Sequence, residues 1–174
     1  MELNIIFLSK WTLFQALVIV ILFSYFYVIE TFSSKGTAPP LNDGFTAVNS
    51  VYLLLLFISV VIFCFYFLFF FQQKKNRAFL SYPIWSRVPL VTIITGVLSF
   101  VVFIFIDLSA DIYSLVQSYG FLLYVFLSYF LFLLYIFIFS MLSTFMMKDQ
   151  TKEKALHLSP FVTVGIFIVL FLVM

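Results

Sequence analysis

"VYLLLLFISVVIFCFYFLFFF", residues 51–71, is a stretch of 21 residues without a charged side chain. A helix that crosses a bilayer needs about 20 predominantly apolar residues to cover a hydrocarbon core of about 30 Å. An apolar block of this length exceeds what the core of a soluble domain requires. The stretch therefore predicts a transmembrane helix.

Four further apolar segments lie at about residues 12–30, 88–107, 121–147 and 160–174. Charged residues make up only 9% of the 174-residue chain and hydrophobic residues 65%, whereas a soluble domain carries about 25% charged residues. The first segment is too long for a signal peptide and no cleavage site follows it, so we expect it to be retained. The sequence predicts an all-α integral membrane protein, with about five transmembrane helices in a single polytopic domain, residues 1–174.

The charged residues outside these segments predict how the chain is threaded. The segments around residues 1–11, 72–87 and 148–159 must share one side of the membrane, and they hold eight basic and three acidic residues. The opposite side holds one basic and four acidic residues. Because loops rich in Lys and Arg stay on the cytoplasmic side, we expect the N-terminus inside and the C-terminus outside.

The start of the fifth helix is predicted from Ser159-Pro160. Ser caps free backbone N–H groups, and Pro is tolerated at the first helical position. This start leaves only 15 residues, about 22 Å of helix. We therefore expect either an earlier start, near Ala155, or a final helix that is sheltered by protein or by a thinned bilayer.

Small and hydroxyl-bearing residues predict where helices pack, because helices in lipid associate through close approach and interhelical hydrogen bonds. The segment 88–107 carries Thr92, Gly96 and Ser99 on nearly one face. We expect this helix at the centre of the bundle. The segment 51–71 carries Phe on nearly every face, so its periodicity does not orient it.

Three acidic residues lie at or just beyond the outer ends of predicted spans: Glu30, Asp107 and Asp111. Asp107 and Asp111 would share a helix face at this spacing and could bind a proton or cation. Their position at the end of a span favours another interpretation, in which they mark the membrane boundary as part of an acidic outer rim. No charged residue lies in the interior of any predicted span, which disfavours proton relays and ion paths.

The basic segment "KKNRAFLSYPIWSR", residues 74–87, interleaves Lys74, Lys75, Arg77 and Arg87 with apolar residues. Such a segment can lie in the membrane interface with its basic groups on anionic headgroups. Ordinary anchoring of a cytoplasmic loop explains the charges equally well.

The residues that usually carry chemistry are scarce. The chain holds one cysteine, Cys64, and one histidine, His157, and no nucleophile–base pair, Gly-rich phosphate loop or metal-ligand spacing is present. We expect His157 to be solvated. No catalytic, cofactor-binding or metal-ligating residue is predicted, and the net charge of +2 is too small to indicate nucleic acid.

These features favour a non-enzymatic accessory or structural subunit of a larger membrane complex, with membrane lipids and other membrane subunits as partners. Phe is abundant and Gly scarce, which indicates an A/T-rich gene. Such a gene fits a bacterial cytoplasmic membrane or an organellar inner membrane, and an organellar origin would favour a respiratory-type assembly. The alternative is a small transporter or channel with an acidic outer vestibule. An enzyme acting on lipid through Asp107 or Asp111 ranks last.

Overall fold

A computed structural model describes residues 9–35, 44–76, 78–110, 121–145 and 149–173. Within these ranges the chain forms five long helices and two short 3-10 turns: α1 (Lys10–Lys35), α2 (Gly44–Lys75), η1 (Phe79–Ser81), η2 (Pro83–Ser86), α3 (Val88–Ala110), α5 (Phe121–Phe145) and α6 (Asp149–Val173). All five long helices are apolar and long enough to cross a bilayer. The predicted class, an all-helical integral membrane protein with five spans, is confirmed.

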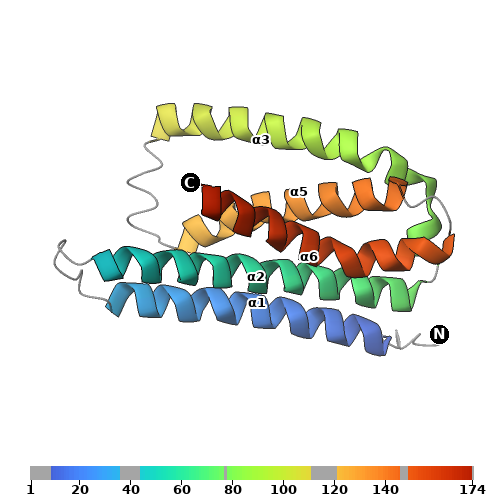
Figure 1. The fold of residues 1–174 in the computed structure, drawn as a ribbon, viewed down its shortest axis with the longest axis horizontal. Coiled ribbons are helices and arrows are strands. Elements are labelled where there is room, and N and C mark those ends of the chain that lie inside the picture. Colours follow the sequence, from blue (N-terminus) through green and yellow to red (C-terminus); the bar gives the residue numbers. More distant parts are fainter. Residues whose placement is uncertain (1–8, 36–43, 77, 111–120, 146–148, 174) are drawn as a thin grey trace, which may run out of the picture.

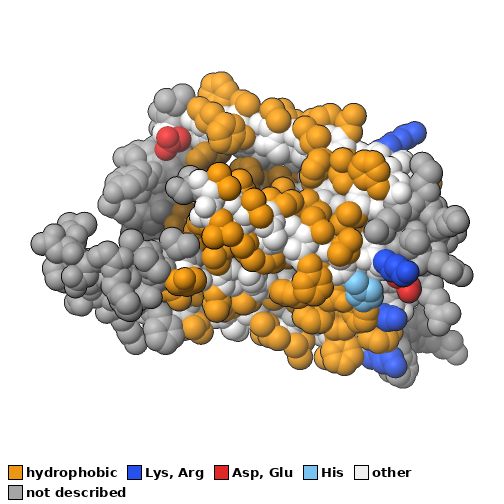
Figure 2. Space-filling view, in the orientation of Figure 1, with side chains coloured by type: hydrophobic (Ala, Val, Ile, Leu, Met, Phe, Trp, Pro, Cys, Tyr) orange, Lys and Arg blue, Asp and Glu red, His pale blue; other side chains and the backbone are white. Residues whose placement is uncertain are grey.

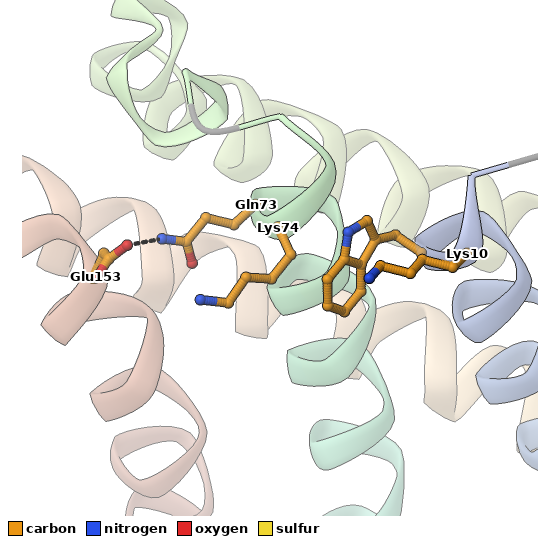
Figure 3. A pocket seen from close by; sticks show the side chains of 5 residues that line it. Lys10, Gln73, Lys74 and Glu153 are labelled. Atoms are coloured by element: carbon orange, nitrogen blue, oxygen red, sulfur yellow. Dashed lines mark hydrogen bonds between the residues drawn. The ribbon is translucent and has the colours of Figure 1, made fainter.

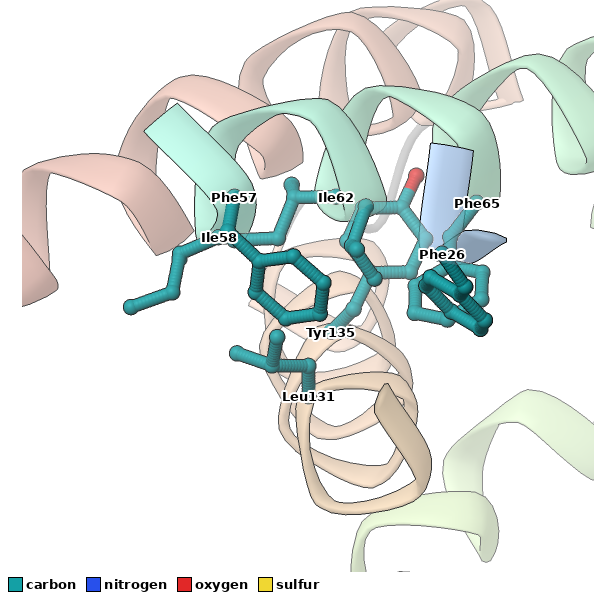
Figure 4. Packing of buried hydrophobic residues seen from close by; sticks show 8 residues of the cluster. Phe26, Phe57, Ile58, Ile62, Phe65, Leu131 and Tyr135 are labelled. Atoms are coloured by element: carbon teal, nitrogen blue, oxygen red, sulfur yellow. The ribbon is translucent and has the colours of Figure 1, made fainter. Parts of the chain in front are cut away.

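The centre of the bundle is α2, which packs against α1, α5 and α6 (Figure 1). One side of α2 contributes the core residues Phe57, Ile58, Val61, Ile62 and Phe65. They meet Phe26 of α1 and Leu131 and Tyr135 of α5 (Figure 4). The tertiary contacts therefore show which face of α2 is buried, which the periodicity of its sequence could not predict.

The helix α3 lies at the edge of the bundle, and the expectation that it would be central is wrong. It packs mainly against α5 and the η2 turn, and Figure 1 shows it apart from α1 and α2. Among its described side chains only Thr92 is buried. Lipid is as apolar as Leu or Val, so a helix can leave most of its aliphatic surface uncovered. The small residues of α3 therefore identify one contact face but not the number of neighbouring helices.

The predicted start of the last helix at Ser159-Pro160 is wrong, and the alternative of an earlier start holds, since the helix begins ahead of Ala155. The helix α6 begins at Asp149, and Pro160 lies inside it. With 25 residues it is about 37 Å long, which removes the shortfall in length. Proline inside a helix lacks the N–H that would bond the carbonyl four residues earlier, here that of Leu156. The Ser159 hydroxyl donates to this carbonyl oxygen over 2.9 Å.

The charged side chains separate to the two ends of the bundle. The basic residues whose side chains are described lie where α1 starts, where α2 ends and where α3 and α6 begin, and Asp107 lies at the far end of α3's span. Figure 2 shows the Lys and Arg side chains gathered at one end of the bundle, with acidic side chains at both ends. We call the end with the Lys and Arg side chains the basic end. That it faces the cytoplasm remains a prediction.

A polar pocket at the basic end of the bundle

A cavity of about 480 Å³ lies among the ends of three helices and is lined by polar and aromatic side chains. We call it the polar pocket; its lining residues are Lys10 and Trp11 of α1, Gln73 and Lys74 of α2, and Glu153 of α6. In Figure 3, Glu153 lies on one side and Lys10 on the other, with Gln73 and Lys74 between them. The pocket brings together residues up to 143 positions apart in the sequence.

Hydrogen bonds between helices hold the walls of the pocket. Gln73, only 6% exposed, donates from Nε2 to Glu153 Oε1 over 2.6 Å and joins α2 to α6 (Figure 3). Lys75 Nζ donates to Thr12 Oγ1 over 3.0 Å and joins α2 to α1. These bonds join side chains of different helices, so they set the spacing of the three helix ends.

A second pair of contacts joins α1 to α2 one turn deeper. Gln15 Nε2 donates to the Leu68 carbonyl oxygen over 3.2 Å and to Gln72 Oε1 over 3.1 Å. A side-chain amide at this depth needs partners because lipid supplies none. The bonds therefore fix the register of α1 against α2 beneath the pocket.

The two lysine ammonium groups of the pocket face aromatic rings. Lys10 Nζ lies 5.4 Å from the centre of the Trp11 ring, and Lys74 Nζ lies 5.3 Å from that of Phe70. Cation–π contacts of this kind are worth about 0.5–1 kcal/mol at exposed sites. Among the described side chains, neither ammonium group forms an ion pair, so both charges are available to an anion.

The single histidine lies next to this region. His157 Nδ1 is 2.7 Å from the Tyr66 hydroxyl, a hydrogen bond between α6 and α2 whose direction depends on the histidine tautomer. The His157 ring is exposed, as expected for a solvated histidine. The bond to Tyr66 was not predicted, because the two residues are 91 positions apart.

The predicted lipid-binding segment contributes only part of the pocket. Lys74 lines it, Lys75 bonds to Thr12, and Arg87 lies exposed just before α3. Arg77 lies outside the described residues.

Several apolar residues of the same segment pack on protein rather than lipid. Leu80 is buried against Phe139 and Leu156. The Trp85 ring lies 4.9 Å from that of Phe139, and Ser140 Oγ donates to the Trp85 carbonyl oxygen over 2.7 Å. The segment is thereby folded back onto α5.

The residues of the acidic outer rim are described only in part. Asp107 is exposed at the end of α3's span. Glu30 lies on α1, and its side chain is outside the described residues, as is Asp111 entirely. The helices α1 and α3 lie on opposite sides of the bundle (Figure 1). The rim remains a prediction.

Of the three predicted packing residues of α3, Gly96 and Ser99 face α5. Thr92 is buried and donates within its own helix to the Val88 carbonyl oxygen over 2.8 Å. A Cβ on Gly96 would lie 4.0 Å from Leu133 Cδ1. The Ser99 and Tyr129 hydroxyls are 2.6 Å apart.

A hollow of about 340 Å³ follows this seam between the two helices. We call it the α3–α5 groove; it is lined by Thr95, Leu98, Ser99, Val102, Phe103, Ile106, Phe126, Tyr129 and Phe130. Its lining is almost entirely apolar apart from the hydroxyl groups of Ser99, Tyr129 and Thr95.

No group of three or more His, Cys, Asp or Glu side chains that could hold a metal ion occurs within the described ranges. The polar pocket itself could not have been found from the sequence. Its lysines are indistinguishable there from ordinary positive-inside residues, and Gln73 and Glu153 acquire meaning only when α2 and α6 meet. Comparison with protein families, curated proteins and solved structures found no match.

Proposed function

We propose that this protein is a non-enzymatic accessory or structural subunit of a larger membrane complex, of respiratory type if its gene is organellar. The observation that carries the proposal is the Ser99–Tyr129 pair in the α3–α5 groove. Two hydroxyl groups hold two hydrogens, and their mutual bond over 2.6 Å uses one of them. Neither group has another hydrogen-bond partner among the described residues.

The depth of this pair makes the spare hydrogen significant. Ser99 lies 11 residues beyond Val88, about 16 Å along α3, which is near the middle of a core of about 30 Å. Lipid tails offer no acceptor at that depth, so a donor there is stabilised by an acceptor on another helix. A transmembrane helix of a partner subunit, seated against the α3–α5 groove, would supply one.

The position of α3 supports the same proposal. Its covered face is narrow, and its remaining aliphatic surface is open to a neighbour. Most of the binding free energy would come from packing. Each interhelical hydrogen bond would add about 0.6–2 kcal/mol.

The test is co-purification from the native membrane after gentle solubilisation. We expect other polypeptides at fixed stoichiometry with the wild-type chain. The double variant Ser99→Ala/Tyr129→Phe should reduce their recovery, and the control Tyr27→Phe, which removes an exposed hydroxyl from α1, should not. Migration of the wild-type chain alone or as a self-oligomer would contradict the proposal.

A further inference from the structure

We propose that the polar pocket and an apolar groove beneath it together bind one glycerophospholipid with a phosphate and hydroxyl groups in its headgroup. This site is distinct from general lipid contact by an apolar surface. It goes beyond the proposed subunit role and is formed by α1, α2 and α6 rather than by α3 and α5.

The headgroup part of the site is the polar pocket. Its volume of about 480 Å³ lies within the range of ordinary small-molecule sites, about 300–1,000 Å³. The lining side chains carry two positive charges and one negative charge, so an anionic group is favoured. The ammonium groups of Lys10 and Lys74 have no ion pair among the described side chains, and phosphate oxygens are suitable acceptors for both.

The opposite wall of the pocket offers acceptors. Glu153 accepts a hydrogen bond from Gln73 Nε2 through its Oε1 atom. Glu153 Oε2 and the side-chain oxygen of Gln73, Oε1, are left as acceptors for a ligand. A headgroup with hydroxyl groups, such as phosphoglycerol, can donate to these oxygens. A choline headgroup has no hydrogen bonded to nitrogen or oxygen and therefore cannot. The pocket should thus distinguish the two headgroups.

The acyl-chain part of the site is a second hollow of about 480 Å³ between α1 and α2. We call it the α1–α2 groove; its lining residues are Val18, Ile21, Leu56, Ser59, Val60, Phe63, Cys64 and Phe67. It begins about 10 Å below Lys74, at Phe67, and extends about 27 Å below it, at Leu56. A single leaflet is about 15 Å of hydrocarbon, so the end of the groove nearest the pocket, at Phe67 and Cys64, lies at the depth of an acyl chain, and the rest of the groove extends past the bilayer midplane.

Aromatic rings connect the pocket to the groove. Trp11, which lines the pocket, stacks on Phe71 with ring centres 6.0 Å apart, and Phe71 stacks on Phe67, which lines the groove, at 6.1 Å. Both hollows also lie next to α6. Phe63 of the groove contacts Phe161 of α6 at 5.9 Å, and α6 is the helix that supplies Glu153 to the pocket. A polar pocket above an apolar groove, joined to it by aromatic rings, matches the headgroup and the acyl chain of one phospholipid.

The experiment is native mass spectrometry of the purified full-length protein, titrated with phosphatidylglycerol or phosphatidylcholine of identical acyl chains. We expect phosphatidylglycerol to be retained at least about tenfold more strongly. Glycerol phosphate, which lacks acyl chains, should bind at least about tenfold more weakly than phosphatidylglycerol. Equal retention of the two lipids would overturn the proposal, and so would binding of glycerol phosphate as strong as that of the lipid. These comparisons use the wild-type chain and do not depend on the folding of a variant.

Two pairs of variants locate the site. Lys10→Gln/Lys74→Gln should weaken binding of phosphatidylglycerol roughly tenfold. The control Arg87→Gln/Lys154→Gln removes two exposed charges at the same end, outside the pocket, and should change binding less than about threefold. Equal losses in both double variants would show charge attraction without a pocket and would overturn the proposal.

The groove is tested by filling it. Val18→Trp, at a groove residue about 12 Å along α1 from Lys10, should reduce retention of phosphatidylglycerol several-fold by occupying the space of the acyl chain. The control Val97→Trp places the same bulk on an exposed position of α3 and should have no effect. Unchanged retention in a folded Val18→Trp protein would remove the groove from the site and overturn the proposal as stated.

Discussion

Ser159 Oγ lies 2.9 Å from the carbonyl oxygen of Leu156 and donates a hydrogen bond to it. This carbonyl would normally accept from the backbone N–H of residue 160, which proline lacks. Ser159 also lies 3.2 Å from the Tyr135 hydroxyl, and both side chains are fully buried. The serine thus compensates for the proline and links α6 to α5, so α6 continues through Pro160.

Replacing this serine should destabilise the protein. Ser159→Ala leaves a buried carbonyl without a donor and removes the Tyr135 contact. We expect the free energy of unfolding to fall by about 1–3 kcal/mol, measured by denaturant titration in mild detergent. Ser86→Ala, which removes an exposed hydroxyl bonded to Pro83 over 2.8 Å, should cost less than about 0.5 kcal/mol.

A double-mutant cycle separates the two roles of Ser159. In a Pro160→Ala background the backbone N–H of residue 160 can itself bond the Leu156 carbonyl oxygen. Ser159→Ala should then cost at least about 0.5 kcal/mol less than in the wild-type background. An equal cost in both backgrounds would mean that the missing proline N–H is not what Ser159 compensates.

Removal of the Phe139 ring should release the loop between α2 and α3. Phe139 is fully buried and contacts the rings of Trp85 at 4.9 Å and Phe69 at 5.5 Å. In a soluble protein, replacing a buried Phe by Ala lowers the free energy of unfolding by about 3–5 kcal/mol. Lipid is itself apolar, so the loss here reflects packing more than transfer, and we expect about 2–3 kcal/mol for Phe139→Ala.

The matched control for Phe139 is Phe145→Ala, because Phe145 lies on the same helix and is 78% exposed. It should change the free energy of unfolding by less than about 0.5 kcal/mol. Tryptophan fluorescence of Trp85 should shift to longer wavelength only in the Phe139 variant, as that ring becomes hydrated. Similar losses of stability in both variants would contradict the packing described for the loop.

Gly96 should tolerate alanine. A Cβ at this position meets only Leu133 Cδ1, at 4.0 Å, which is ordinary van der Waals contact. Alanine lowers the conformational entropy of the unfolded chain, so Gly96→Ala should be neutral or stabilising by up to about 1 kcal/mol. Gly165→Ala, where nothing lies within 4 Å, should behave alike.

A large side chain at Gly96 should act differently. Gly96→Trp must displace α5. A disulfide engineered across the α3–α5 seam should therefore form more slowly in the Gly96→Trp variant than in the otherwise wild-type protein. If Gly96→Ala instead destabilised the protein by more than about 1 kcal/mol, the two helices would be closer together than described.

The Tyr66–His157 hydrogen bond should couple α2 to α6 weakly. Tyr66→Phe and His157→Phe should each cost less than about 1.5 kcal/mol, with a coupling free energy of about 0.5–1 kcal/mol in a double-mutant cycle. The site is exposed, so water replaces much of the lost bond. A coupling free energy near zero would show that the two groups do not interact in solution.

Particular residues show which parts of the fold and of the candidate sites could be predicted from the sequence. The apolar runs predicted the spans because hydrophobic length alone decides whether a helix crosses a bilayer. Thr92, Gly96 and Ser99 were identified by residue type; Gly96 and Ser99 face α5, and Thr92 is buried. The polar pocket was missed because Lys10, Gln73 and Glu153 belong to three different predicted segments. Their proximity depends on which helices are neighbours, and residue type carries no information about that.

The sequence by itself determined that the chain has five apolar segments of spanning length and that eight of its nine basic residues fall at one end. Only the tertiary structure decided that α2 is central, that α3 is peripheral and that Pro160 lies inside α6. The physical reason is the solvent. In lipid, a buried and an uncovered helix face are equally apolar, so hydropathy does not distinguish them. Packing shape and a few hydrogen bonds, such as those of Gln73 and Ser159, then select the arrangement.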